Sequence, residues 1–279
     1  MREGRRDSAP RLVELRRLLA HFDWEAQSRL VEDGGSGLAG AVLVTSRAAP
    51  EGTFARIEVA AAGTDSAVVM RELVRWGLQL SRAAGAASAQ VWVGPGLHDV
   101  LRKCGLEMVR PWWRMDRKLS GELPQPKSVA GYELLDGSDL PPGGWAEMHN
   151  RSFADHWRFS PRSEDELMAG KQPQLCLMAV TAGSREPAAL TLCQVENYTD
   201  DPRPQPVGLI SSVGTLPVHR RRGLANWLVT ESVARLRRAG ACSASLYVDG
   251  SSPFRAFDVY RKLGFELAFE TEVWEATFR

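Results

Sequence analysis

The sequence predicts a mixed α/β protein in which one domain occurs twice. Two internal matches indicate the duplication. Leu73–Val93 aligns without gaps with Leu228–Val248, 155 residues further along the chain. Asp99–Glu107 is identical to Asp258–Glu266 at six of nine positions, at an offset of 159 residues. Because the two matches follow one another in the same order, chance is a poor explanation and a duplicated domain is expected.

Alternating strand and helix patterns in the second copy predict the mixed α/β class. Short apolar runs there are typical of strands, and amphipathic runs are typical of helices. The predicted strands are Tyr132–Leu135, Leu175–Val180, Ala188–Val195, Gly208–Leu216, Ala244–Val248 and Glu266–Thr277. The predicted helices are Trp145–Phe153, Ser163–Ala169, Gly223–Arg238 and Phe254–Leu263. Hairpins followed by a strand–helix–strand unit are expected to form a mixed sheet with helices on its faces.

A segment with two prolines and little apolar periodicity separates the copies. It predicts a first domain over residues 1–119, a linker over 120–130 and a second domain over 131–279. In the first copy, apolar residues at helical spacing predict a helix over Leu12–Val31. Trp112 and Trp113 lie in its last predicted strand, where packing is expected rather than ligand binding.

Composition excludes several function classes. The 279 residues hold 35 Lys+Arg and 34 Asp+Glu, and this even balance argues against a nucleic-acid binder. No apolar run is long enough for a membrane span, and the basic N-terminus lacks the apolar core of a signal peptide. The four cysteines are scattered and form no Cys-x-x-Cys pair, so we expect reduced thiols, no metal site and a cytoplasmic protein.

The run Val213–Ala225 is the most informative segment. It predicts a strand end, a loop with three consecutive arginines, and a helix that begins near Gly223. The first amides of a helix have no partner within the helix, and the helix dipole makes this end positive. Gly223 has no side chain to keep a ligand from the backbone. The segment therefore predicts a phosphate-binding site; the alternative is a solvated basic loop.

Arg220-x-x-Gly223-x-Ala225, after a Val-Gly-Thr strand and a Pro, resembles the acyl-CoA pyrophosphate loop of the GNAT N-acetyltransferase superfamily. Leu246–Gly250, followed by Ala256-x-x-x-Tyr260 and Gly264-Phe265, is similar to the strand and helix that come next in that superfamily. The tandem arrangement is similar to that of mycothiol synthase and related two-domain acetyltransferases. The resemblance covers residues 130–279 directly, and it reaches the first copy only through the repeat.

The resemblance implies two tandem GNAT-like domains and transfer of an acetyl group from acetyl-CoA, the co-substrate, to a primary amine by direct attack. Backbone groups of residues 213–215, in the predicted strand, would bind the pantetheine arm, and one of their amides would polarise the thioester carbonyl. Tyr260 would protonate the leaving thiolate. The implied cofactor-binding residues are Val213, Gly214, Thr215, Arg220, Arg221, Arg222, Gly223, Leu224, Ala225, Asn226 and Ser252, the last lying where the family often has Asn.

The sequence offers several candidates for the base that deprotonates the amine. Relatives often carry an acid five residues before the loop's first Val, and this position is Gly208 here. We expect Glu196, at the end of a neighbouring strand, to replace it. His149, Asp155 and His156 are weaker candidates, and water is an equal alternative.

The first copy departs from the motif. At the offset of 155, Gly223 corresponds to Val68, Ala225 to Met70 and Arg220 to Asp65. At the offset of 159, Tyr260 corresponds to Leu101. A bulky loop with a negative charge is a poor phosphate site, so the first domain is predicted to be degenerate and catalytically silent, and to shape the substrate cleft.

Three functions are compatible with the sequence. A small-molecule amine is the first hypothesis. The alternatives are a non-catalytic acyl-CoA sensor or interaction protein and an enzyme that acetylates protein N-termini or lysines. The expected partners are the amine alone, with no nucleic acid and no membrane, and the chain is expected to be a monomer or a homodimer.

Overall fold

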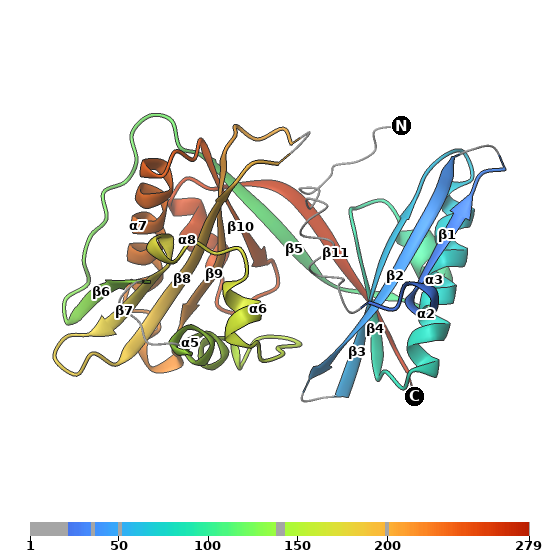
Figure 1. Cartoon of the computed structure of the whole chain (residues 1–279), viewed down its shortest axis with the longest axis horizontal. Helices are drawn as coiled ribbons and strands as arrows, with labels where there is room; N and C mark the ends of the chain where they lie inside the picture. Colours follow the sequence, from blue (N-terminus) through green and yellow to red (C-terminus); the bar gives the residue numbers. More distant parts are fainter. Residues whose placement is uncertain (1–21, 35–36, 50–51, 138–142, 199–200, 279) are drawn as a thin grey trace. The chain divides into compact units, whose positions relative to one another are not determined.

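The computed structural model describes residues 22–34, 37–49, 52–137, 143–198 and 201–278, which form two compact units (Figure 1). The first unit holds the described residues up to Trp112 and those from Phe269 onward. The second unit is Trp113–Ala268. These bounds differ from the sequence-based division at 120–130, because the last strand of each copy passes from one unit into the other.

The first unit is a twisted sheet with helices packed on it. Its sheet order is β1-β2-β3-β4-β11. Its elements are α2 (Trp24–Gln27), β1 (Ser28–Glu32), β2 (Leu38–Ala49), β3 (Gly52–Ala61), α3 (Ser66–Ala83), β4 (Ser88–Val93) and α4 (His98–Lys103), with the end of β11. The core lies between this sheet and α3, and includes Val42, Ile57, Val74 and Val91.

The second unit has the sheet order β5-β10-β9-β8-β7-β6. Strand β5 spans Glu107–Lys118, and the part of it from Trp113 onward belongs to this unit. The other elements are β6 (Tyr132–Asp136), α5 (Gly144–Phe153), α6 (Glu164–Met168), β7 (Leu177–Thr181), β8 (Pro187–Glu196), β9 (Val207–Thr215), α7 (Leu224–Arg238), β10 (Ser243–Asp249), α8 (Ala256–Lys262) and the start of β11 (Glu266–Thr277). Every strand and helix predicted in this copy is confirmed, with ends that differ by two residues at most. The mixed α/β class is confirmed as well.

The two copies exchange their final strands. β11 ends the second copy, yet its residues 272–277 pair antiparallel with β4 of the first unit. β5 ends the first copy, and it lies beside β10 in the sheet of the second unit. Trp274 is accordingly buried in the core of the first unit, and Met115 in that of the second. Each core thus needs a strand from the other copy.

Strand alternation in the second unit places helices on both faces of the sheet. Leu177 and Ala179 of β7 pack in a cluster with Leu224 and Trp227 of α7. Met178 and Val180, the alternate residues, pack in a cluster with Trp145 and Met148 of α5. Helix α7 and helix α5 therefore cover opposite faces, and β8 and β9 lie between them.

The predicted helix over Leu12–Val31 is wrong in its second half. Residues 12–21 lie outside the described residues. The one-turn helix α2 is capped by the Asp23 side chain and ends at Ser28, whose backbone is extended. Ser28–Glu32 then pairs with β2 as strand β1. The backbone bonds of a sheet edge outweigh the helical spacing of the apolar residues here.

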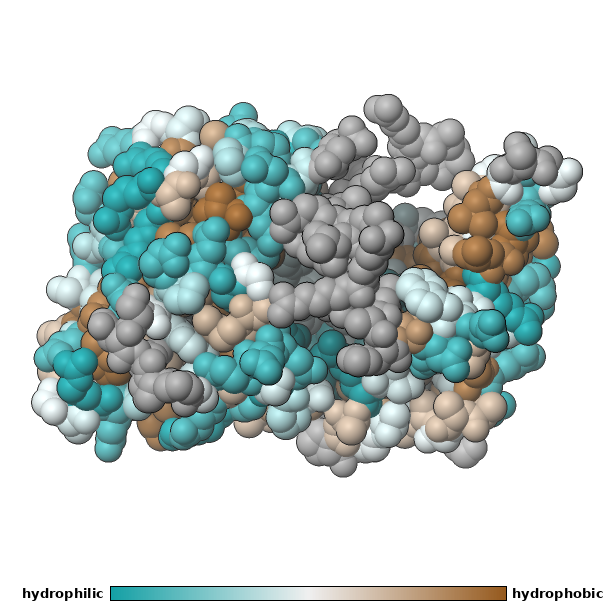
Figure 2. All heavy atoms as spheres, in the orientation of Figure 1, coloured by the Kyte–Doolittle hydropathy of each residue, from teal (hydrophilic) through white to brown (hydrophobic). Residues whose placement is uncertain are grey.

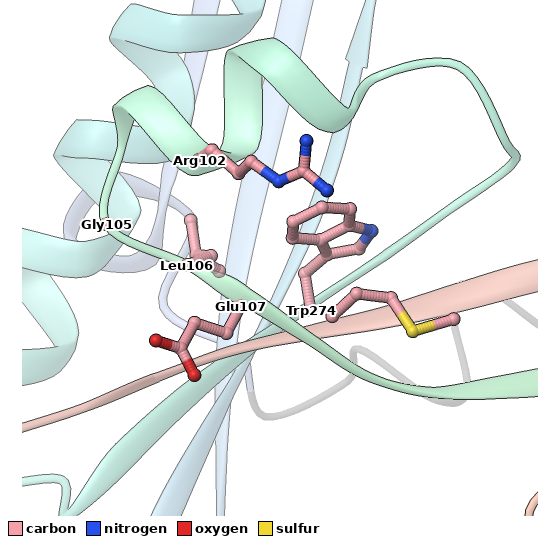
Figure 3. Close-up of a pocket in the computed structure, with 6 residues that line it drawn as sticks. Arg102, Gly105, Leu106, Glu107 and Trp274 are labelled. Atoms are coloured by element: carbon pink, nitrogen blue, oxygen red, sulfur yellow. The ribbon is translucent and has the colours of Figure 1, made fainter.

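Each unit carries a similar groove beside its exchanged strand. In the first unit the groove is lined by Arg102, residues 105–108 and Trp274 (Figure 3). In the second unit the lining includes Arg261, Phe265, Glu266 and Leu267, each 159 residues beyond its counterpart, with Met115 in the place of Trp274. The duplication is therefore visible in tertiary structure as well as in sequence.

The surface gives no sign of a membrane-spanning helix: among the described residues, none of the helices is long and apolar enough to cross a bilayer. Hydrophobic surface gathers over β1 and β2 of the first unit (Figure 2), where Leu30 and Leu38 are exposed. The view of the second unit in Figure 2 is mostly hydrophilic.

Replacing Trp274 by Ala tests the strand exchange. We expect a loss of about 3–5 kcal/mol in the unfolding free energy of the first unit, because the indole is 1% exposed in its core. Native-state hydrogen exchange should accelerate for amides of β2–β4 and not for those of β7–β9. Leu267→Ala, at an exposed site on the same strand, is the matched control. Acceleration confined to β7–β9 would contradict the exchange.

Candidate functional site

Two adjacent strands of the second unit, β9 and β10, separate part-way along their length. β9 and β10 pair in parallel only from Val207↔Ser243 to Ile210↔Leu246. Beyond that point β9 continues to Thr215 and β10 to Asp249. A bulge in the β8–β9 pairing lies at the same level, between Leu192 and Cys193. Along residues 211–215, the backbone groups on the side of β9 that faces β10 are therefore not paired with that strand.

A short loop, which contains the 3-10 turn Pro217–His219, leads from the open strand to helix α7 at Leu224. The first helical bond of α7 runs from the Trp227 N–H to the Gly223 carbonyl. The amides of residues 221–226 donate to no acceptor within the described parts of the chain. Gly223 caps the helix at φ +88°, and Arg221 also has a left-handed φ of +64°. Successive amides in such a turn, at the positive end of a helix dipole, form an anion site.

Two of the three arginines in this loop are engaged within the protein. The Arg222 guanidinium donates to the Tyr132 hydroxyl (3.2 Å) and to the Val218 carbonyl (3.2 Å). The Tyr132 hydroxyl also lies 2.9 Å from Nδ1 of His219. Tyr132 and His219 therefore brace the loop, which the sequence motif alone did not indicate.

Arg220 is held even more firmly. Its Nε donates to the Thr215 carbonyl, and its two terminal nitrogens donate to the Asp155 carboxylate and the Ser152 carbonyl. Its guanidinium also lies 4.3 Å from the ring centre of Phe254. These bonds engage the Arg220 side chain within the protein, while its backbone lies in the predicted cofactor-binding loop. Arg221 is exposed and makes no hydrogen bond or ion pair with the described residues.

Other predicted binding residues contribute backbone rather than side chain. Leu224 is 1% exposed and packs in the core under α7, so only its amide can face a ligand. A Cβ at Gly214 would come within 2.9–3.0 Å of Ser152 and Phe153, so this glycine lets α5 approach β9 closely. Val213 packs against the cluster that contains Ile210 and Leu246.

Tyr260 and Ser252 lie on the β10 side of the opening. Tyr260, on α8, is buried in the same apolar cluster as Ile210, Leu246 and Val248, where the strands part. Burial raises the pKa of its hydroxyl, so the phenol keeps its proton. Ser252 lies in the turn after β10, where its hydroxyl accepts from the Phe254 N–H (3.4 Å).

Glu196 lies apart from the other predicted residues. It pairs with Val207, whereas Thr215 pairs with Ala189 seven residues away along β8, or about 23 Å at strand spacing. Glu196 is 8% exposed and accepts from Gln194 (2.5 Å), which in turn accepts from Lys171 (2.6 Å). Burial lowers the pKa of Lys171. Glu196 therefore has polar neighbours, but it lies beside the start of β9 and not beside Thr215 at its end.

The position of the family's usual acid is closed to a carboxylate. A Cβ at Gly208 would lie 2.8–3.0 Å from the Leu236 side chain of α7. The weaker base candidates also have unsuitable surroundings. Burial lowers the pKa of His149 to about 4. The hydrogen bond from Arg220 holds the pKa of Asp155 below its usual value. Both groups are thus weak bases at neutral pH.

An aromatic row runs from α5 toward the opening. His149 stacks on Phe153 (4.5 Å between ring centres), Phe153 lies 4.7 Å from His156, and His156 lies 5.9 Å from Phe254. The aromatic side chains of residues 149–156 therefore pack against one another and against Phe254. Within the described residues no group of His, Cys, Asp and Glu could hold a metal ion.

The corresponding loop of the first copy is absent. Helix α3 begins at Ser66, with Asp65 as its N-cap. At the repeat offset this start is three residues earlier than that of α7. The residues that would form the loop are therefore wound into the first helical turn, although β3 and β4 also pair over only four positions, up to Ile57.

Comparison with solved structures identifies the fold. A GCN5-related N-acetyltransferase from Sphaerobacter thermophilus matches with a TM-score of 0.75 at 20% identity, over 96% of this chain and 85% of that one. A tandem GNAT protein from the clavulanic acid biosynthesis pathway matches with a TM-score of 0.68 at 19% identity, over 99% and 90%. Both likenesses show the GNAT fold.

Sequence comparison agrees with the fold. The FR47-like protein family model matches residues 199–274, the segment that holds the open strand and the loop. A mycothiol acetyltransferase from Sanguibacter keddieii is 26% identical over 238 residues, which are 77% of this chain and 75% of that protein. The chain is similar to GNAT acetyltransferases in both fold and sequence. Its second unit carries the loop, and its first unit lacks it.

Lowering the pH should reveal the buried imidazole of His149. Its pKa is about 4 in the folded protein against 6.5 when exposed, so only the unfolded chain binds a proton between these values. The contribution of the neutral His149 to the unfolding free energy is therefore fully present at pH 7. It is lost as the pH falls from about 6.5 to about 4, which lowers the unfolding free energy by about 3 kcal/mol. Urea denaturation of the protein and of His149→Gln should show a smaller fall for the variant. An equal fall would disprove the assignment.

Proposed function

We propose that the chain is an acetyl-CoA-dependent N-acetyltransferase that acts on the primary amine of a small molecule. The observation that carries the proposal is the opening between β9 and β10 that leads to the bare amides at the start of α7. An extended arm and an anionic group, joined as in acetyl-CoA, match this pair of features. The likeness to a mycothiol acetyltransferase supports a small-molecule acceptor.

The residues present fit a CoA thioester. The unpaired edge over Val213–Thr215 would bind the pantetheine arm as an added strand. The amides from Arg221 to Asn226 would hold the pyrophosphate, with the exposed Arg221 guanidinium nearby. Ser252, in the turn after β10, would contact the arm from the opposite side. Acetyl-CoA supplies the activated acetyl group.

The chemistry assigned to the chain is positioning and proton transfer. The amine nitrogen attacks the acetyl carbonyl carbon, and the carbon–sulfur bond breaks. A β9 amide beside the opening would donate to the carbonyl oxygen as negative charge develops there. Tyr260, which burial keeps protonated, would give its hydroxyl proton to the departing sulfur. The amine would lose its proton to water or, through water, to Glu196.

The first unit is proposed to be catalytically silent. Its helix α3 begins early and removes the loop, and Asp65 places a negative charge at the helix start. In this proposal residues 131–279 form the catalytic copy and residues 1–119 a degenerate one. Binding of a second acetyl-CoA at residues 65–70 would contradict it.

Gly223→Ala tests the anion site against a matched control. Gly223 (φ +88°) and Gly240 (φ +90°) lie at the two ends of α7, and a Cβ would meet nothing closer than 3.9 Å at either. Both substitutions therefore carry a similar backbone cost of about 1–2 kcal/mol. Calorimetry with CoA should show a loss of affinity of about tenfold or more for Gly223→Ala and little change for Gly240→Ala. Equal affinities would count against the site, and an unaltered protein that binds no CoA would end the proposal.

Tyr260→Phe tests the proton donor. We expect acetyl transfer to fall about a hundredfold at pH 7, because the sulfur then leaves without its proton, while CoA affinity stays within about twofold. Thiol release from acetyl-CoA over a panel of small amines measures the rate. Tyr198→Phe, which keeps the ring against Arg203, is the control. Undiminished turnover by Tyr260→Phe would remove this residue from the mechanism.

A further inference from the structure

The Arg220 side chain lies where three segments of the second unit meet. It bonds to Thr215 at the end of β9 (3.2 Å) and to Ser152 near the end of α5 (3.1 Å). It forms a two-pronged ion pair with Asp155, at 2.5 and 2.9 Å. Its flat face covers the ring of Phe254, in the loop that follows β10. One side chain thus joins α5, β9 and the β10–α8 loop.

These contacts occupy every nitrogen of the Arg220 guanidinium. Nε and both terminal nitrogens already donate to protein oxygens, and the side chain is 19% exposed. A phosphate ligand would have to draw the guanidinium away from a carboxylate and two carbonyls. Arg221 in the next position is exposed and carries the same charge without such bonds. Recognition of phosphate therefore does not need the Arg220 side chain.

The contacts also span the opening between the strands. Thr215 ends β9 on one side, and Phe254 follows β10 on the other. No backbone pairing joins β9 to β10 beyond Ile210 and Leu246. The Arg220–Phe254 contact therefore connects the two sides of the opening, and the bonds to Ser152 and Asp155 connect Arg220 to α5 and to the residues that follow it.

We propose that Arg220 is a positioning residue, which sets the width of the opening that receives the pantetheine arm by joining the Asp155 carboxylate to Thr215 and Phe254. It acts through these partners and not as a ligand of the pyrophosphate. The inference rests on the proposed function of the second unit as an acetyl-CoA site.

The sign of the effect of Asp155→Asn on CoA affinity decides between the two roles. If Arg220 is a phosphate ligand, removal of the competing carboxylate frees it and adds positive charge, so CoA binds more tightly. If Arg220 holds the opening, loss of the ion pair loosens both edges, and CoA binds three- to tenfold more weakly. Calorimetry with CoA measures the change. Asp155 is 43% exposed, so the variant is expected to fold, and thermal unfolding checks this.

Further variants separate positioning from a general loss of structure. Asp155→Glu keeps a two-oxygen acceptor and should recover most of the affinity that Asp155→Asn loses. Arg220→Gln should weaken binding to a similar degree, and the double variant Arg220→Gln/Asp155→Asn should be no weaker than the single ones, because both remove the same contact. Arg221→Gln should reduce the salt dependence of CoA binding, whereas the double variant Arg220→Gln/Asp155→Asn, which leaves the net charge unchanged, should not.

Three results would overturn the inference. These are tighter or unchanged CoA binding by Asp155→Asn, equal losses for Asp155→Asn and Asp155→Glu, or additive losses in the double variant. In each case the unaltered protein still binds CoA, so the proposed function survives. A failure of the unaltered protein to bind CoA is a different result and overturns the proposed function together with this inference.

Discussion

The backbone amides that the second unit leaves without partners are the feature on which its site depends. Buried or half-buried backbone groups are almost always paired within a protein, because an unpaired group has a free-energy cost. Here β9 stays paired with β8 but no longer pairs with β10 after Ile210, and the amides of residues 221–226, at the start of α7, donate to no backbone acceptor in the described residues. Both sets of donors lie within the continuous segment 211–226. A ligand with an extended polar arm and an anionic end can satisfy them together.

Other parts of the second unit hold the segments that carry these unpaired amides in place. Helix α5 contacts β9 through Gly214, where any side chain would collide with Ser152 or Phe153. Tyr132 of β6 bonds to His219 and Arg222 of the arginine loop, and Arg220 bonds to the Ser152 carbonyl of α5. The exchange of β5 and β11 completes each core with a strand from the other copy. Loss of the loop in the first copy therefore leaves that copy a structural role, since its strand β5 is part of the second unit's sheet.

Several features of the site follow directly from local sequence. The alternation of strands and helices, the helix start at Gly223 and the arginine loop are local properties, set by side-chain period and by the conformational freedom of glycine. The roles within the loop are different. Arg220, Arg221 and Arg222 look alike in the sequence, yet their partners come from positions as distant as Asp155 and Tyr132. No spacing rule connects those positions, because the contacts form only when the sheet brings α5 and β6 beside the loop.

The sequence by itself determined the duplication, the mixed α/β class and the place of the proposed anion site, because repeats and backbone capping depend on neighbouring residues. The tertiary structure decided which copy each final strand completes, why Gly208 faces Leu236 and admits no acid, and where Glu196 stands. It also showed that the periodic run ending at Val31 joins a sheet edge. These outcomes depend on pairing between segments far apart in the chain, and such pairing is chosen by the packing of the whole unit rather than by any one segment.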